Sequence, residues 1–452
     1  MNITVAGCGK IGTAILEALL NEGHNITVID NNQSRLNEMV NIYDVIGVCG
    51  GCVDSDTLTE ANMVDCNVFI ATTGSDESNM LSCFFAKRMG AGHTIARIRD
   101  TDYNDNSLGF IKQSLGLSMS INPEFLAAKE LFNILQLPSA VKIETFSSRS
   151  FEMIELKLKS DSPLNKMKLI DMREKYKATF LVCTVQRGDE IYIPDGNFEL
   201  LAGDKIGIIA STVEIAKLLK KLAPLQKQAK DIMILGGSRT AIYLAKRLAN
   251  NGSNVKIIEQ DANRCELLCE ELPGSSVICG DGAQQEILLE EGLNSMDAFV
   301  ALTGLDEENI LMSVFASSKD VPKIIAKVNR EELSVIAGNL GVDCVITPSK
   351  IISDVVVRYS RALANATGSK VETLYKIADG KAEALEFIVS QDFRGKNIPL
   401  KDLELKKGIL IGGIIRGRKT IIPSGADCIL ADDKVIVVSC EKRINDLQDI
   451  LR

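Results

Sequence analysis

Apolar residues along this chain follow a pattern that alternates between strands and helices. Runs of about four to six apolar residues alternate with amphipathic stretches of about a dozen, which is typical of βαβ units on a parallel sheet. In the first half the pattern predicts strands at residues 2–6, 26–30, 43–48, 67–72, 94–98 and 118–121. We therefore expect a Rossmann-like parallel-sheet domain at the start of the chain.

A helix is predicted over residues 122–136. Asn122, Pro123 and Glu124 supply an N-cap residue, a proline in the first turn and an acid that favours the helix dipole. The apolar stripe of this helix can be buried against its own domain or against another subunit, and we expect the helix to end at Leu137–Pro138. The stripe comprises Phe125, Ala128, Leu131, Phe132 and Leu135.

The two halves of the chain repeat each other. The strand end Val28-Ile29-Asp30 returns as Ile257-Ile258-Glu259, and Thr73-Gly74 returns as Thr303-Gly304, at shifts of 229 and 230 residues. The register continues beyond the nucleotide-fold part, because Ile193-Pro194-Asp195-Gly196 matches Ile422-Pro423-Ser424-Gly425. Such a constant shift indicates duplication of a unit of about half the chain.

Each duplicated unit has two parts. After about residue 140 the pattern changes to alternating strands, such as residues 154–158, separated by turns. The predicted fold class is α/β, with two tandem Rossmann-like parallel-sheet domains that are each followed by a small α+β domain. The expected domains are residues 1–138, 139–224, 229–366 and 367–452.

Composition excludes several classes of function. The 452 residues carry a net charge of −9, which argues against nucleic-acid partners because phosphate-backbone affinity rests on clustered Lys and Arg. The start of the chain does not resemble a signal peptide, and no stretch reaches the roughly 18 apolar residues of a membrane span. We therefore expect a cytoplasmic protein, in which the twelve cysteines are thiols rather than a disulfide framework.

A glycine-rich loop, Gly7-Cys8-Gly9-Lys10-Ile11-Gly12, stands between the first strand and a helical stretch. Gly7 permits the tight turn, Gly9 lets the backbone approach a pyrophosphate, and Gly12 lets the helix pack on the sheet. Asp30 ends the second strand, where it can bind ribose hydroxyls and repel a 2′-phosphate, which favours NAD(H) or an adenine nucleotide over NADP(H). The alternative is a tight turn that has lost its ligand.

Other candidates lie at the carboxyl ends of neighbouring strands, where open α/β sheets bind ligands. Arg97 can reach a phosphate or form an ion pair with Asp76 or Glu77. The candidate binding residues of the first site are Gly7, Cys8, Gly9, Lys10, Ile11, Gly12, Asp30, Gly51, Cys52, Thr72, Thr73, Gly74 and Arg97.

The second half carries an altered version of this site. Ser238 replaces the glycine for close backbone approach, and Ala241 replaces the packing glycine, so we expect weaker pyrophosphate binding. The sequence leaves open whether nucleotide occupies this second site. Its candidate residues are Gly236, Gly237, Ser238, Arg239, Thr240, Glu259, Asp281, Thr303 and Lys327.

Catalysis and metal binding have little support. Cys49 and Cys52 have the spacing of a zinc or redox motif, but a zinc site needs two more ligands, and the chain has no second C-x-x-C and only two histidines, His24 and His93. Neither histidine is a good acid or base for a dehydrogenase. We expect a nucleotide sensor without catalytic residues or metal, with an NAD-dependent oxidoreductase as the main alternative and an amino-acid-binding module ranked lower.

These features carry a family resemblance. The paired halves, the glycine loop, Asp30 and the Ala-x-Thr-Gly-x-Asp-Glu-x-Asn stretches at residues 71–79 and 301–309 resemble the TrkA family of tandem RCK (Trk-N plus Trk-C) proteins. The resemblance implies a homo-oligomeric dimer or ring, peripheral on the inner face of the cell membrane, that gates a membrane potassium-translocating subunit in response to NAD(H) or ATP/ADP. It also implies nucleotide contacts at residues 7–11, Asp30, Thr73, Gly74 and Arg97. Gly51 departs from the family, which commonly has an acid there.

Overall fold

The computed structural model describes the chain except for residues 101–104, 138–139, 147–150, 159, 177–178, 189, 223–227, 366–370, 441–443 and 445. The predicted end of the 122–136 helix at Pro138 therefore lies partly outside the described residues. Among the helices of the described part, none combines the length and the apolar character that crossing a membrane requires.

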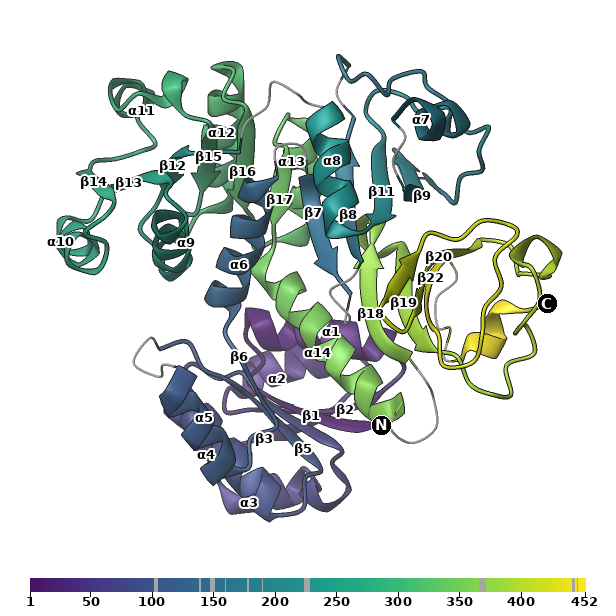
Figure 1. The fold of residues 1–452 in the computed structure, drawn as a ribbon. Coiled ribbons are helices and arrows are strands. Elements are labelled where there is room, and N and C mark those ends of the chain that lie inside the picture. Colours follow the sequence, from purple (N-terminus) through teal and green to yellow (C-terminus); the bar gives the residue numbers. More distant parts are fainter. Residues whose placement is uncertain are drawn as a thin grey trace. The chain divides into compact units, whose positions relative to one another are not determined.

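The first half forms a 6-stranded parallel sheet in the order β3-β2-β1-β4-β5-β6 (Figure 1). Helices α1 and α2 cover one face of this sheet, and α4 and α5 cover the other. The strand order reverses between β1 and β4, so the carboxyl ends of these two strands form the switch point where open sheets bind ligands. The strands are β1 (Asn2–Ala6), β2 (Asn25–Asp30), β3 (Ile46–Cys49), β4 (Val68–Ala71), β5 (His93–Arg97) and β6 (Met119–Ile121), and the helices are α1 (Lys10–Asn21), α2 (Gln33–Ile42), α3 (Ser55–Glu60), α4 (Asp76–Arg88), α5 (Asp105–Leu115) and α6 (Pro123–Gln136).

One predicted strand begins later than expected. The pattern placed the third strand at residues 43–48, but β3 begins at Ile46. Tyr43 caps the end of α2, and the Val45 amide donates to the Tyr43 carbonyl, so these residues form the turn between helix and strand. The side chains of these residues favour a strand, but the hydrogen-bonded turn after α2 delays the start of the strand.

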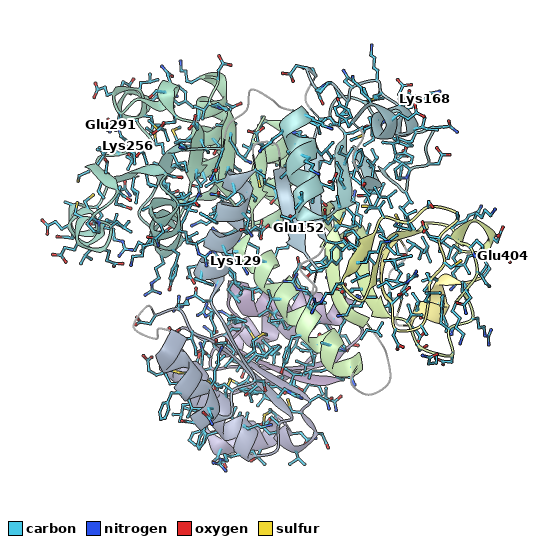
Figure 2. All side chains as sticks on the ribbon, viewed as in Figure 1. Lys129, Glu152, Lys168, Lys256, Glu291 and Glu404 are labelled. Carbon is cyan, nitrogen blue, oxygen red and sulfur yellow. The ribbon has the colours of Figure 1, made fainter. Side chains whose placement is uncertain are left out.

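The second half repeats this sheet, in the order β14-β13-β12-β15-β16-β17. The predicted duplication is thus present at the level of strand order. Near the amino end of this sheet, Lys256 Nζ lies 2.8 Å from Glu291 Oε2, and Figure 2 labels both side chains. The strands are β12 (Asp231–Leu235), β13 (Asn254–Glu259), β14 (Ser276–Cys279), β15 (Ala298–Ala301), β16 (Lys323–Lys327) and β17 (Cys344–Ile346), and the helices are α9 (Arg239–Asn250), α10 (Ala262–Glu271), α11 (Gln285–Glu290), α12 (Asp306–Ser318), α13 (Glu331–Asn339) and α14 (Pro348–Asn365).

Two 5-stranded antiparallel sheets of equivalent strand order form the smaller domains. Their repeat extends to single side chains, because Arg187 pairs with Asp204 and Arg416 pairs with Asp433, each at 2.8 Å. The first sheet contains β7 (Ala140–Thr145), β8 (Glu152–Lys157), β9 (Phe180–Arg187), β10 (Glu190–Tyr192) and β11 (Lys205–Ala210), accompanied by α7 (Leu169–Tyr176) and α8 (Thr212–Leu222). The second contains β18 (Val371–Ile377), β19 (Ala382–Ile388), β20 (Ile409–Arg416), β21 (Lys419–Ile421) and β22 (Lys434–Ser439).

The two small sheets share a hydrophobic core. Phe146, Phe151 and Ile209 of the first pack with Tyr375 and Val438 of the second. The Phe146 and Tyr375 rings meet edge to face, with their centroids 5.1 Å apart. Burial of these large side chains stabilises the pair of small domains as one body.

Contacts divide the chain into two compact units that exchange helical segments. Unit 1 contains residues 1–128 with residues 328–331 and 346–360, and unit 2 contains the remainder. Unit 1 therefore combines the first parallel sheet with the first part of α14. Unit 2 includes the second half of α6, where Lys323 Nζ donates to the carbonyls of Ile134 and Leu137, each at 2.5 Å.

This exchange decides where the apolar stripe of α6 is buried. Leu131 and Leu135 are fully buried within unit 2, whereas Phe125 remains exposed. The sequence left open whether this stripe packs on its own domain or on another subunit. In the structure its second half is buried within unit 2 of the same chain.

Candidate functional site

The glycine loop of the first half has the geometry that its spacing predicted. Gly7 has a φ of +97°, and a β-carbon there would lie 3.0 Å from the backbone of Thr72. A β-carbon on Gly12 would lie 1.8 Å from the Gly7 carbonyl oxygen, so α1 can approach the loop only with glycine at this position. Gly9 has nothing within 4 Å of the place of a β-carbon, which leaves room above the loop.

Asp30 at the end of β2 holds this loop. Its Oδ2 accepts a hydrogen bond from the Cys8 amide at 2.7 Å, and its Oδ1 accepts one from the Asn32 amide at 2.9 Å. Arg35 Nη1 lies 3.8 Å from Asp30 Oδ2. Burial, followed by the charge of Asp30, raises the pKa of Cys8 to about 12, so the thiol is neutral at physiological pH.

The first turn of α1 is open to an anion. Its N-cap, Gly9, provides no side-chain hydrogen bond, and the turn contains no acidic residue. The first amides of a helix have no partner within the helix, and they carry the positive end of its dipole. Lys10 is exposed and Ile11 is half-buried on this turn. The arrangement suits a phosphate group.

The threonines after β4 shape the loop through their hydrogen bonds. The Thr72 hydroxyl donates to the carbonyls of Ala6 and Gly7, each at 3.1 Å. The Thr73 hydroxyl and amide both donate to Asn79 Oδ1, at 2.7 and 2.8 Å. Gly74 has open space beside it. Asn79 was not among the candidate residues, although its place in the repeated stretch at residues 71–79 was a signal for it.

Arg97 and Asp76 are not partners of each other. Arg97 donates to the Thr73 carbonyl, whereas Asp76 Oδ2 accepts from the amides of Arg99 and Asp100, at 2.7 and 2.8 Å. Arg99 Nε lies 3.7 Å from Asp76 Oδ1. Burial, followed by the charge of Arg99, lowers the pKa of Arg97. Its buried Nε finds no acceptor among the described residues.

Gly51 and Cys52 offer fewer groups to a ligand than the residues of the glycine loop do. Gly51 is exposed, and its nearest neighbour is the side chain of Asp54. Cys52 packs against the hydrophobic core beneath the sheet, and burial raises the pKa of its thiol. A ligand at this site would therefore meet the backbone of Gly51 rather than the sulfur of Cys52.

The second loop is similar in backbone but different at its helix. Gly236 has a φ of +93°, and the Gly237 amide donates to Glu259 Oε2 at 2.7 Å, as the Cys8 amide does to Asp30. Ser238 caps α9, because its Oγ accepts from the Ala241 amide at 3.4 Å. This side chain takes one of the amides that stay open in α1. Arg239 is exposed and Thr240 is buried on the same turn.

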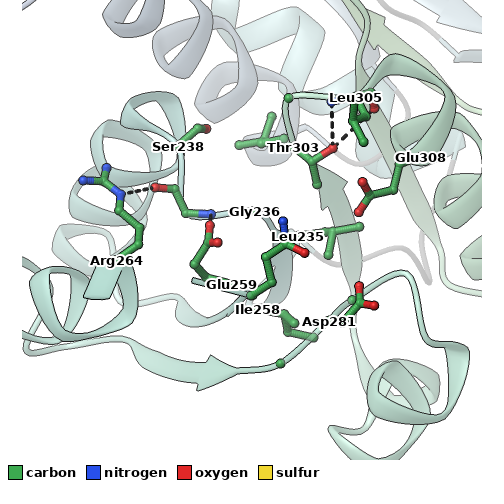
Figure 3. Close-up of a pocket in the computed structure, with 16 residues that line it drawn as sticks. Leu235, Gly236, Ser238, Ile258, Glu259, Arg264, Asp281, Thr303, Leu305 and Glu308 are labelled. Carbon is green, nitrogen blue, oxygen red and sulfur yellow. Dashed lines mark hydrogen bonds between the residues drawn. The ribbon is translucent and has the colours of Figure 1, made fainter. Parts of the chain in front are cut away.

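A pocket of about 390 Å³ opens at the carboxyl ends of β12, β13 and β15 (Figure 3). Glu259, Asp281 and Glu308 contribute carboxylates to its walls, and burial together with the charges of Asp281 and Glu259 raises the pKa of Glu308. Arg264 Nε donates to the Gly237 carbonyl at 2.9 Å. Lys327 Nζ donates to the Leu302 carbonyl at 3.2 Å.

The pocket of the second site, called the second pocket below, is more acidic than the first site. Asp281 and Glu308 stand where the first half has Gly51 and Ser78. Thr303 repeats the role of Thr73, since its hydroxyl donates to Asn309 Oδ1 at 2.8 Å. The sequence prediction did not include Glu308 or Arg264, although Arg264 repeats Arg35 at the shift of 229 residues.

Comparison with known proteins agrees with this architecture. The chain matches the TrkA-N domain at residues 3–122 and 232–348, and the TrkA-C domain at residues 153–223 and 396–452. It is 31% identical over 453 residues to the Trk system potassium uptake protein TrkA homolog of Archaeoglobus fulgidus, covering 100% of both chains. It is 30% identical over 461 residues to the Trk system potassium uptake protein TrkA of Vibrio alginolyticus, covering 100% of this chain and 99% of that one.

A solved structure has the same fold over nearly the whole chain. The GsuK channel bound to NAD matches with a TM-score of 0.65 at 15% identity, covering 97% of this chain and 76% of that chain. The tandem domains match along both halves, and the relatives align from end to end. The chain therefore belongs to the TrkA family.

Proposed function

We propose that this protein is the nucleotide-sensing regulatory subunit of a Trk-type potassium uptake system. The observation that carries the nucleotide site is the uncapped first turn of α1, with open space at Gly9 and the carboxylate of Asp30 beside it. A phosphate binds the open amides of such a turn, and a carboxylate at the end of the second strand accepts hydrogen bonds from ribose hydroxyls.

The ligand of the first site is NAD(H) or an adenine nucleotide such as ATP or ADP. Asp30 repels a 2′-phosphate, which disfavours NADP(H). Arg97 is a candidate phosphate ligand, because its buried Nε finds no acceptor among the described residues. The solved GsuK channel, which shares this fold, is bound to NAD. These observations favour a pyrophosphate above the loop of residues 7–12.

The second site binds nucleotide more weakly. Ser238 occupies the helix N-terminus, and the carboxylates of Glu259, Asp281 and Glu308 repel phosphate groups. The pocket nevertheless has a carboxylate in the ribose-binding position, Glu259, and about 390 Å³ of space. This combination suits the nucleoside part of a ligand better than its phosphates.

The partner is a membrane subunit that translocates potassium. The relatives are named as Trk system potassium uptake proteins, which supports a place for this chain in the same kind of system. We place it in the cytoplasm, peripheral on the inner face of the membrane, as a homo-oligomer. A nucleotide that binds one shape of that assembly better than another shifts the populations of the two and so gates transport.

An NAD-dependent oxidoreductase is not favoured. A dehydrogenase needs an acid or base beside the nicotinamide, near the carboxyl ends of the strands. His93 begins β5 at the opposite end of the sheet, and His24 lies before β2, also at the amino end. Neither histidine is placed for hydride-transfer chemistry.

The experiment that tests this function is calorimetric titration with NADH, NAD, ATP and ADP. Wild type is compared with Asp30→Ala and with Glu259→Ala, the matched variant in the second half, and each variant is first checked for cooperative thermal unfolding. We expect Asp30→Ala to weaken binding at least about tenfold, because it removes a charged hydrogen-bond acceptor. Glu259→Ala leaves the stronger binding event in place.

Two further readouts complete the test. A strain that lacks its own TrkA should regain growth at low potassium with wild type but not with Asp30→Ala. A hydride-transfer assay runs in parallel. Absence of saturable binding to wild type would contradict the nucleotide sensor, and steady substrate-dependent oxidation of NADH would favour the oxidoreductase.

A further inference from the structure

Two cysteine side chains approach each other beside the second pocket. Cys265 lies in the first turns of α10, and Cys279 is the last residue of β14. The thiol of Cys265 donates to the carbonyl oxygen of Glu259 at 3.3 Å, and the same oxygen accepts from the Gly280 amide at 2.9 Å. In the sheet register, Cys279 is the direct partner of Glu259. The Cys265 thiol and the backbone amide that follows Cys279 therefore bind the same carbonyl group, which places the two cysteines side by side.

The two thiols differ in their access to solvent. Cys279 is exposed, whereas Cys265 is buried. Burial, followed by a hydrogen bond with the Cys279 thiol and by its charge, raises the pKa of Cys265 to about 11, so this thiol is protonated at neutral pH. Thiolates are the attacking species in disulfide exchange. An oxidant consequently meets Cys279 first, and Cys265 is placed to act second.

The first half of the chain provides an internal comparison. Cys49 is the equivalent of Cys279, but Leu36 and Val40 stand at the positions of Cys265 and Cys269. Both aliphatic side chains pack beneath β3, within 3.2 Å of the place where a β-carbon on Gly47 would be. The thiol pair is thus a property of the second half alone, and it is distinct from the Cys49-x-x-Cys52 spacing.

We propose that Cys265 and Cys279 form a reversible disulfide, which makes this pair an oxidation site on the wall of the second pocket. A small-molecule disulfide supplies the oxidising equivalents. The Cys279 thiolate attacks one sulfur of that molecule, forms a mixed disulfide and releases the first thiol. Cys265 then loses its proton and attacks the Cys279 sulfur, which releases the second thiol. Two protons and two electrons pass to the small disulfide, which becomes two thiols.

The bond would connect two walls of the pocket. Arg264, directly before Cys265, and the Gly280-Asp281 segment, directly after Cys279, both line it. The helix α10 and the end of β14 would then move as one piece. This oxidation site goes beyond the nucleotide function and does not depend on which ligand the pocket takes.

The test titrates the full-length protein with buffers of reduced and oxidised glutathione at pH 7.5. After free thiols are blocked with N-ethylmaleimide, the intact mass reports how many remain. We expect a step in which two of the twelve thiols are lost and are regained with dithiothreitol. Trypsin with a glutamate-specific protease separates Cys265, Cys269 and Cys279 onto different peptides, because Arg264, Glu266, Glu270 and Glu286 flank them. Oxidised protein should yield the Cys265 and Cys279 peptides linked.

Matched variants identify the pair. Cys279→Ser, an exposed position, should abolish the two-thiol step, whereas Cys269→Ser and Cys49→Ser should leave it unchanged. The wild-type peptide map does not depend on whether any variant folds. A map without the Cys265–Cys279 link at every glutathione ratio, or with Cys269 in the link instead, would overturn the proposal.

Discussion

A β-carbon on Gly12 would lie 1.8 Å from the carbonyl oxygen of Gly7, so the first turn of α1 rests directly on the loop before it. At Gly9, two residues after Gly7, the same construction finds nothing within 4 Å. The absence of a side chain therefore has a different consequence at each of the two positions. Gly12 is required for α1 to pack on the loop, whereas Gly9 leaves open space above the loop.

Alanine at these two positions should separate folding from binding. Gly12→Ala overpacks the contact between loop and helix, which costs about 1 to 3 kcal/mol of unfolding free energy. Gly9→Ala should change stability by less than about 0.5 kcal/mol but weaken nucleotide binding, because its methyl group enters the open space. Urea unfolding and calorimetry on the same samples check both. Equal stability losses in the two variants would contradict this division.

Ser238→Gly should improve anion binding at the second site. The substitution removes the hydroxyl that accepts from the Ala241 amide, so the first turn of α9 becomes open like that of α1. Replacing a serine cap by glycine costs only a few tenths of a kcal/mol. Titration in the Asp30→Ala background isolates the second site. Unchanged affinity would mean that the surrounding carboxylates, rather than Ser238, limit the site.

Arg97 should contribute to binding, and Arg99 should not. Arg97→Gln removes a half-buried guanidinium whose buried Nε has no acceptor among the described residues, and loss of a charged hydrogen bond corresponds to roughly tenfold or more in affinity. Arg99→Gln is the control, since Arg99 lies against Asp76 and Gly74. Calorimetry with ADP compares them. A larger effect for Arg99→Gln than for Arg97→Gln would contradict this prediction and assign the phosphate contact to Arg99.

The fold was easier to predict than the partners of single side chains. The glycine loop and the constant shift between halves predicted two Rossmann-like parallel sheets, because both features depend on backbone geometry and on the spacing of residues along the chain. The choice between Arg97 and Arg99 as the partner of Asp76 depends on how the chain turns after β5, which the pattern of apolar residues does not encode. Likewise, the apolar stripe on α6 indicates that this face of the helix is buried, but it does not indicate which surface covers it.

Glu308→Gln should stabilise the protein at neutral pH. The pKa of Glu308 is raised above its ordinary value of 4.5 by burial and by Asp281 and Glu259, so its ionised form is disfavoured in the folded state. Wild type therefore loses stability as pH rises from 4.5 through the folded pKa. The variant avoids this loss, and its advantage should shrink as pH falls to 4.5. Urea unfolding from pH 4.5 to 8 measures it, with Ser78→Gln as the control.

Within unit 1, the Tyr359 hydroxyl lies 3.1 Å from His93 Nδ1, which connects α14 to β5. Tyr359→Phe removes this hydrogen bond and should cost roughly 0.5 to 1.5 kcal/mol above pH 7. Burial, followed by the charge of Lys87, lowers the pKa of His93 from its ordinary value of 6.5. The unfolded chain therefore takes up a proton first as pH falls below 6.5, and stability declines until the folded pKa is passed.

Comparison of His93→Gln with wild type tests this dependence. The variant cannot take up the proton, so its unfolding free energy should fall less between pH 7.5 and 5.5. The double variant His93→Gln with Tyr359→Phe should lose less stability than the sum of the single losses, because both remove the same hydrogen bond. Additive losses would mean that the two side chains stabilise unit 1 independently, and parallel pH profiles would assign the titration to another group.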